Sequence, residues 1–276
     1  MTANRLGYET NPIGNYPTGF GKRELKLLET AREDHKNILE SWDAPLVWSS
    51  VDQEGALLAT STPAAGDEIA FRTTKHTFLA HIQSVNGTPV HSFPFVSANG
   101  LELNTDDDVT NGILGWEITN GILGTSKCAY TIGSFSEPAK KIFFEATINE
   151  TDISDITKLF IGFRKAEAFQ ASVDDYDEAA AIGIDDSGNI DIMTILNGAG
   201  TDTVDTTQNK TEATAITLRV TVANNGKVEF FIDGAKPTVT TTFTFDSGEV
   251  IIPFLHFVAD TGDPGAYVSV WRCGVL

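Results

Sequence analysis

The stretch from Thr217 to Phe257 constrains the fold more than any other part of the chain. Apolar and polar residues alternate through residues 218–222, the chain turns at Asn224-Asn225-Gly226, and the alternation resumes through residues 228–232. A second turn at residues 233–237 leads to a Thr-rich strand that carries Phe243 and Phe245, and an apolar run ends at Phe257. Strands separated by turn residues at each break predict an antiparallel β-sandwich.

Similar alternation recurs along most of the chain, which is also rich in Gly, Thr and Phe. We expect roughly ten to twelve strands in the sandwich, enough for two packed sheets. The strand at residues 218–222 begins at Ile216, and further strands are predicted at residues 46–50, 69–71, 77–82, 90–96, 101–103, 116–119, 128–132, 141–148, 159–164, 179–184, 190–195 and 267–272. The first four of these form a small β-region, residues 46–95, ahead of the sandwich at residues 96–276.

The N-terminal 45 residues have a different character. Residues 1–21 carry Pro12, Pro17 and several aromatic residues without periodicity, so we expect either an extended arm that docks on a partner or a disordered tail. Residues 22–42 place apolar residues three to four apart, which predicts one amphipathic helix ended by Pro45. Residues 1–45 are therefore expected to be an arm and a helix.

Charge is distributed unevenly. The net charge is −19, yet residues 1–41 contain six Lys/Arg and six Asp/Glu and are neutral, so residues 42–276 carry all of the excess. Such a body repels nucleic acid and anionic membranes, because phosphate contacts need Lys and Arg. No apolar run is long enough to cross a bilayer and no signal peptide is evident, so we expect a chain made in a cytoplasm.

The order of several strand sequences resembles a known family. FFEATI (143–148), KLFIGFRK (158–165), AIGID (181–185), LRVTV (218–222), EFFIDG (229–234) and IIPFLHF (251–257) occur in the order seen in concanavalin A-like lectin/glucanase jelly rolls. The resemblance covers residues 95–276 and extends to the jelly rolls of tailed-bacteriophage structural proteins. It implies a concanavalin A-like fold and a role in a virion or in sugar binding.

Glucanases of that family use an E-x-D-x-x-E pattern, because hydrolysis needs two carboxylates beside the scissile bond. The nearest match here has Asn189 and Thr194 in place of both glutamates and keeps only Asp191. We therefore expect no enzyme activity. The five histidines lack metal-ligand spacing, and the acidic runs 106–108 and 174–178 are expected to be solvated loops rather than calcium sites, so no metal and no cofactor are predicted.

Sugar binding would need exposed aromatic rings. Trp116, Tyr176, Tyr267 and Trp271 are the candidates, and each could equally be a core residue because it lies within or beside a strand. Cys128 and Cys273 are expected to be buried thiols, with a bridge between two strands as the alternative.

These observations favour a virion structural protein, most simply a capsid decoration protein on the outer capsid surface, made in the host cytoplasm. Its expected partners are the major capsid protein and copies of itself in a homotrimer. The residues expected to grip the shell are Tyr8, Tyr16, Phe20, Leu25 and Leu28. The alternative is a carbohydrate-binding tail-fibre or receptor-binding protein that contacts a surface glycan through Trp116, Tyr176 or Trp271.

Overall fold

A computed structural model describes the backbone of residues 38–41, 68–72, 77–85, 95–96, 100–103, 114–119, 129–259 and 265–276. Side chains are described for residues 78–82, 101, 103, 117–119, 129–259 and 265–276. All of these residues belong to one compact unit, Ile38–Leu276. Within them the structure is almost entirely β, with no α-helix and a single 3-10 turn, η1 (Val173–Asp175). The described residues include no helix long and apolar enough to span a membrane.

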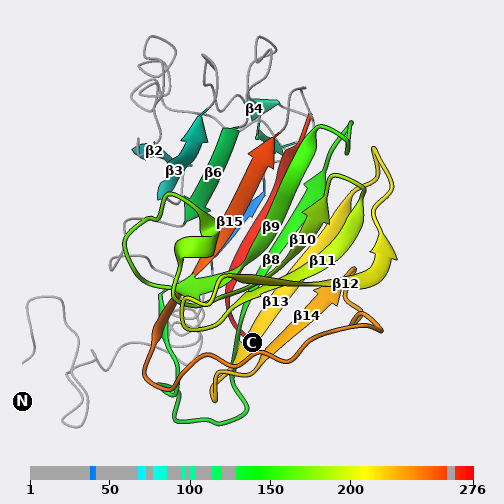
Figure 1. Cartoon of the computed structure of the whole chain (residues 1–276). Coiled ribbons are helices and arrows are strands. Elements are labelled where there is room, and N and C mark those ends of the chain that lie inside the picture. The colour runs from blue at the N-terminus through cyan, green and yellow to red at the C-terminus, as the bar shows by residue number, and fades with distance from the viewer. Residues whose placement is uncertain are drawn as a thin grey trace, which may run out of the picture. The chain divides into compact units, whose positions relative to one another are not determined.

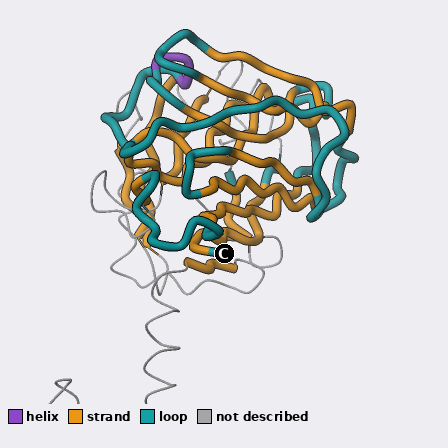
Figure 2. Tube along the Cα trace, turned by 90° about the horizontal axis from the view of Figure 1, so that it is seen from below, coloured by secondary structure: helices purple, strands orange, loops and turns teal. Residues whose placement is uncertain are grey.

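The strands form two antiparallel sheets (Figure 1; Figure 2 turns the chain by 90°). The seven-stranded sheet runs in the order β14 (Val228–Ile232), β13 (Ile216–Ala223), β8 (Lys141–Asn149), β16 (Tyr267–Val275), β5 (Gly100–Glu102), β4 (Phe95–Val96), and β1 (Ile38–Ser41) also pairs with β16. The nine-stranded sheet runs β12 (Thr201–Asn209), β11 (Asn189–Ile195), β10 (Ala179–Asp185), β9 (Ile156–Lys165), β15 (Val250–Ala259), β6 (Leu114–Thr119), β3 (Thr77–Val85), β2 (Glu68–Arg72), and β7 (Tyr130–Thr131) also pairs with β15. The predicted jelly-roll β-sandwich is thus confirmed.

The hairpin of β13 and β14 forms where the alternation predicted it. Leu218 pairs with Ile232 and Val222 with Val228, so the apolar residues of both strands face the other sheet. Gly226 completes the turn with a φ of +85°, and a Cβ at this position would lie 2.1 Å from the carbonyl oxygen of Phe245. The turn therefore requires glycine for both its backbone angle and its packing.

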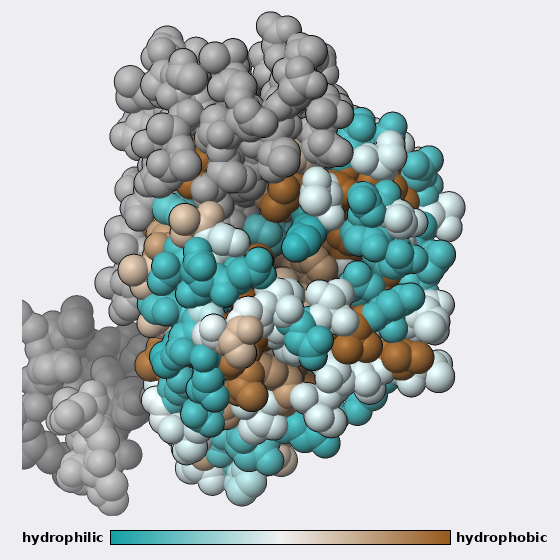
Figure 3. Space-filling view, viewed as in Figure 1, coloured by the Kyte–Doolittle hydropathy of each residue, from teal (hydrophilic) through white to brown (hydrophobic). Residues whose placement is uncertain are grey.

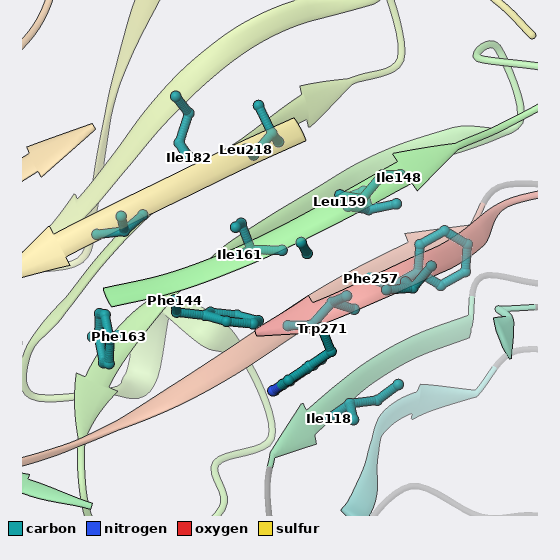
Figure 4. Close-up of a cluster of buried hydrophobic side chains, with 14 of the residues drawn as sticks. Ile118, Phe144, Ile148, Leu159, Ile161, Phe163, Ile182, Leu218, Phe257 and Trp271 are labelled. Atoms are coloured by element: carbon teal, nitrogen blue, oxygen red, sulfur yellow. The ribbon is translucent and has the colours of Figure 1, made fainter. Parts of the chain in front are cut away.

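The main core lies between the two sheets (Figure 4). At its centre, the ring of Trp271 on β16 packs 4.3 Å from that of Phe144 on β8 and 5.3 Å from that of Phe78 on β3, centroid to centroid. Trp271 is 1% exposed. Phe163 on β9 completes an edge-to-face contact with Phe144, so aromatic rings from both sheets interlock.

Two predicted elements need correction. The helix expected over residues 22–42 does not extend through residues 38–41, which form strand β1 antiparallel to β16, with Ile38 opposite Cys273. Backbone pairing with β16 outweighs the helical spacing, to which this segment contributes only Ile38 and Leu39. Residues 22–37 lie outside the described residues. The Thr-rich strand is reduced to one bridge between Lys227 and Thr244, although Phe243 and Phe245 are buried in the core as expected.

One strand, β12, has no counterpart among the predictions. Its sequence TDTVDTTQN is polar, and most of its residues are at least partly exposed because it is the edge of the nine-stranded sheet. An edge strand with charged side chains resists pairing with other chains. Because neither face of β12 is buried in the core, its sequence lacks the alternation of apolar and polar residues that predicts a strand.

Strands on both sides of residue 95 share the two sheets. β3, from the region expected to be a small β-region, pairs with β6 and so continues the nine-stranded sheet, while β4 pairs with β5 in the other sheet. The predicted strand at residues 46–50 and most of that at 90–96 lie outside the described residues. Cys273 is buried in β16, and Cys128 lies outside the described residues.

Candidate functional site

A pocket opens at one end of the sandwich, where three connections meet. They are the β8–β9 loop, the β10–β11 turn and the β12–β13 loop, and the pocket has a volume of about 410 Å³. It is a shallow hollow that is largely open to solvent. Its wall is mostly polar and consists of Ile153, Ser154, Asp186, Ser187, Lys210, Thr211 and Glu212.

A buried ion pair supports the wall of this pocket. The Lys210 ammonium donates to Glu150 Oε1 at 2.5 Å and to the Thr211 carbonyl oxygen at 2.6 Å, and both charged side chains are almost fully buried. Burial raises the pKa of Glu150, and the hydrogen bond from Lys210 opposes this rise. Glu150 Oε2 has no hydrogen-bond partner in the structure. The pair therefore fixes the position of Lys210 at a cost in desolvation.

A second group of polar residues lies on the outer face of the nine-stranded sheet, the face turned away from the main core. Strand alternation sends Leu159, Ile161 and Phe163 into the core and Phe160 and Arg164 to the outer face. The pairing register aligns one residue from each of seven neighbouring strands in a row across this face: His81, Glu117, His256, Phe160, Gly183, Asp191 and Asp205.

Glu117 is the centre of a fully buried network on this face. Arg164 Nε donates to Glu117 Oε1 at 2.6 Å, and the Tyr176 hydroxyl donates to Glu117 Oε2. All three residues are 0% exposed. Burial raises the pKa of Glu117 against the opposing effects of Arg164 and Tyr176, and burial followed by the Glu117 charge raises the pKa of Tyr176. Both carboxylate oxygens are occupied, so Glu117 is placed to hold structure rather than to attack a substrate.

The same network anchors residues 166–178, which we call the covering loop. Arg164 Nη1 donates to the carbonyl oxygens of Lys165 and Glu167, and its guanidinium lies 4.4 Å from the Tyr176 ring centroid. Val173 and Tyr176 of the loop pack with Phe254 and other outer-face residues in a second, smaller hydrophobic cluster. Figure 1 shows the loop passing in front of the sheet near β15 and β9. The loop therefore covers this part of the outer face.

The covering loop begins and ends at an acidic cluster. The Lys165 amide donates to the Glu178 carbonyl oxygen at 2.9 Å, and the Lys165 ammonium bridges Asp177 and Glu249, the latter at 2.9 Å. Glu178 is 1% exposed. Burial, and then the neighbouring Glu249 and Asp246, raise the pKa of Glu178 from 4.5 to about 8. The cluster therefore holds a proton at neutral pH.

This cluster predicts a loss of stability in alkaline solution. A raised folded-state pKa gives stability that is complete below the unfolded pKa of 4.5 and is lost as the pH rises through about 8. We expect Glu178→Gln to be more stable than the wild type at about pH 9, by roughly 1–2 kcal/mol, with little difference at about pH 5. Urea unfolding at both pH values measures this. Asp175→Asn, an exposed acid of the same loop, is the control, and an equal pH response in all three proteins would refute the assignment.

The strand that matches the glucanase pattern is β11, and the structure gives it no pair of glutamates. Asn189 donates its side-chain amide to Asp185 Oδ2 at 2.8 Å, and Thr194 is 8% exposed. Burial, with the charges of Asp185 and Asp205, raises the pKa of Asp191. Among the described residues, no group of three His, Cys, Asp or Glu side chains could hold a metal ion.

The structure does not bring together Tyr176 and Trp271, two of the candidates for sugar stacking. Tyr176 and Trp271 are buried on opposite sides of the nine-stranded sheet, so neither ring offers a face to a ligand. Trp116 lies in β6, but its side chain is outside the described set, and Tyr267 is partly exposed in β16. The shell-gripping candidates Tyr8, Tyr16, Phe20, Leu25 and Leu28 also lie outside the described residues.

Sequence reasoning did not find either site. In the sequence, Glu117 is 47 residues from Arg164 and 59 residues from Tyr176. The pocket is lined by residues from three separate connections. The one available signal was a charged residue inside an apolar strand, as Arg164 is in KLFIGFRK and Glu117 is in LGWEIT. A buried charge implies a partner, although the sequence does not say which.

No family model matches the sequence, and no curated protein is similar to it in sequence. Solved structures with a similar chain course include the carbohydrate-binding module CBM66 from Bacillus subtilis, at 8% identity over 60% of this chain and 89% of that chain, with a TM-score of 0.36. Galectin LEC-6 from Caenorhabditis elegans aligns at 15% identity over 56% of this chain and 99% of the galectin chain, with a TM-score of 0.33. The carbohydrate recognition domain of Emp47p aligns at 12% identity over 77% and 93%, with a TM-score of 0.42. All three TM-scores are low, and the sandwich assignment rests on the strand pairings themselves.

Proposed function

We propose that the protein is a non-catalytic carbohydrate-binding protein and that the pocket at the end of the sandwich is its binding site. The pocket itself is the observation that carries this proposal. Its wall combines hydroxyl groups from Ser154, Ser187 and Thr211 with carboxylates and one ammonium around a single apolar residue. Convergent groups of this kind form hydrogen bonds with the hydroxyl groups of a sugar.

The absence of catalysis is part of the proposal. A glycosidase needs one carboxyl group whose surroundings keep it protonated beside a second that is ionised. Asp186 and Glu212, the two acids of the pocket wall, are both exposed residues. The buried Glu150 is paired with Lys210.

A pocket-filling substitution tests the site. We expect binding of a glycan identified by array screening, with millimolar to micromolar affinity, and a loss of at least about tenfold in Ser154→Trp, whose indole would occupy the pocket. Ser247→Trp, at another exposed serine outside the pocket wall, should bind like the wild type. Titration calorimetry measures both. A flat array, or equal affinity in both variants, would reject the pocket as a glycan site.

A capsid decoration protein remains our second candidate, favoured by the acidic body, whose charge excludes nucleic acid and anionic membranes as partners. In that role the protein would form a homotrimer and bind the major capsid protein of assembled shells through residues 1–45. Co-sedimentation with intact and stripped particles addresses it. For the carbohydrate-binding function, we propose a place in a tail fibre or receptor-binding protein. Both candidate functions would therefore make the protein part of a virion.

A further inference from the structure

The pocket has many hydrogen-bond acceptors and few remaining donors. Ser154 Oγ donates its proton to Asp152 Oδ1 at 2.7 Å, and Ser187 Oγ donates to Asp186 Oδ1 at 3.0 Å. Each serine oxygen is left to a ligand as an acceptor, because a hydroxyl group has a single proton to donate. Two of the three protons of Lys210 are already used within the protein.

The charge of the pocket follows the same pattern. Lys210 is the only cation of the wall, and its partner Glu150 neutralises it at 2.5 Å. Among the described residues neither Asp186 nor Glu212 has a cationic partner, although the Ile153 amide donates to Glu212 Oε1 at 3.4 Å. The pocket therefore presents negative charge, on a protein whose net charge is already −19.

A ligand that fits this inventory must donate hydrogen bonds and carry positive charge. Resting on the carbohydrate-binding function above, we propose that the pocket selects a glycan with free amino groups, the ammonium lying between Asp186 and Glu212 and the sugar hydroxyl groups donating to the serine oxygens. An acidic sugar would be repelled by the two carboxylates. An N-acetylated sugar would lose the charge-assisted hydrogen bonds, which are the stronger kind.

The test compares a short glucosamine oligomer with the same oligomer after N-acetylation. At about pH 6, where an amine of this kind is protonated, we expect the amine form to bind at least about tenfold more tightly and its affinity to fall with added salt. Asp186→Asn combined with Glu212→Gln should remove at least about tenfold of that affinity. Titration calorimetry gives the affinities, and thermal unfolding checks that the variant is folded.

A charge-matched control distinguishes binding in the pocket from the general attraction of a cation to an acidic protein. Asp202→Asn combined with Asp205→Asn, on the exposed edge strand β12, removes the same two charges outside the pocket and should leave binding unchanged. Equal loss in the two double variants would overturn the proposal. Tighter binding of the N-acetylated form, still sensitive to Ser154→Trp, would overturn the amine preference and leave the glycan site intact. Binding of no oligomer and no array glycan would reject the proposed function itself.

Discussion

Replacing Arg164 with methionine is expected to lower the free energy of unfolding by about 3–5 kcal/mol. The substitution removes the guanidinium that bonds Glu117 Oε1 at 2.6 Å and leaves a carboxylate with 0% exposure without this counter-charge. It also removes the bonds that hold the carbonyl oxygens of Lys165 and Glu167 at the start of the covering loop. Urea unfolding measures the change, and limited proteolysis within residues 166–178 should become faster.

The matched control is the double variant Arg164→Met with Glu117→Gln. Removing both charges eliminates the unpaired ion, so the double variant should recover a large part of the loss, about 1–3 kcal/mol. If the double variant is as unstable as the single one, the cost arises from lost packing of the arginine stem rather than from the ion pair.

Trp271→Ala should also destabilise the protein by about 3–5 kcal/mol, because it opens a cavity between the two sheets. The indole contacts Phe144 and Phe78, whose ring centroids lie 4.3 and 5.3 Å away. The variant matters for function as well, since Trp271 was a candidate for stacking on a sugar. We expect unfolding at lower urea concentration with unchanged glycan affinity in the fraction that remains folded.

Phe231→Ala provides the comparison for the tryptophan. Phe231 lies on the outward face of the same sheet, partly exposed, with the Arg219 guanidinium 4.5 Å from its ring centroid. Its loss should cost only roughly 1 kcal/mol. Equal costs for the two substitutions, or a selective loss of glycan binding in Trp271→Ala, would contradict the core assignment.

The main strands could be predicted because each has one face in the core and so carries its burial pattern in its sequence. The hairpin of β13 and β14 is an example, with apolar residues from 218 to 232 alternating around the turn at Gly226. β12 could not be predicted in this way, since an exposed edge strand has no apolar face to display. Residues 38–41 were misassigned because a segment with only two apolar residues, Ile38 and Leu39, fits a helix or a strand, and its pairing with β16 decides between them.

The sequence by itself determined the fold class and the loss of the glucanase glutamates, since both depend on residue type at fixed local spacing. It did not determine the roles of particular side chains. Tyr176 and Trp271 were equal candidates for sugar stacking in the sequence. In the structure the Tyr176 hydroxyl bonds the buried Glu117, whereas Trp271 fills the space between the two sheets. The tertiary structure alone decided these roles and assembled the pocket, because pairing register and loop contacts join residues that no local pattern relates.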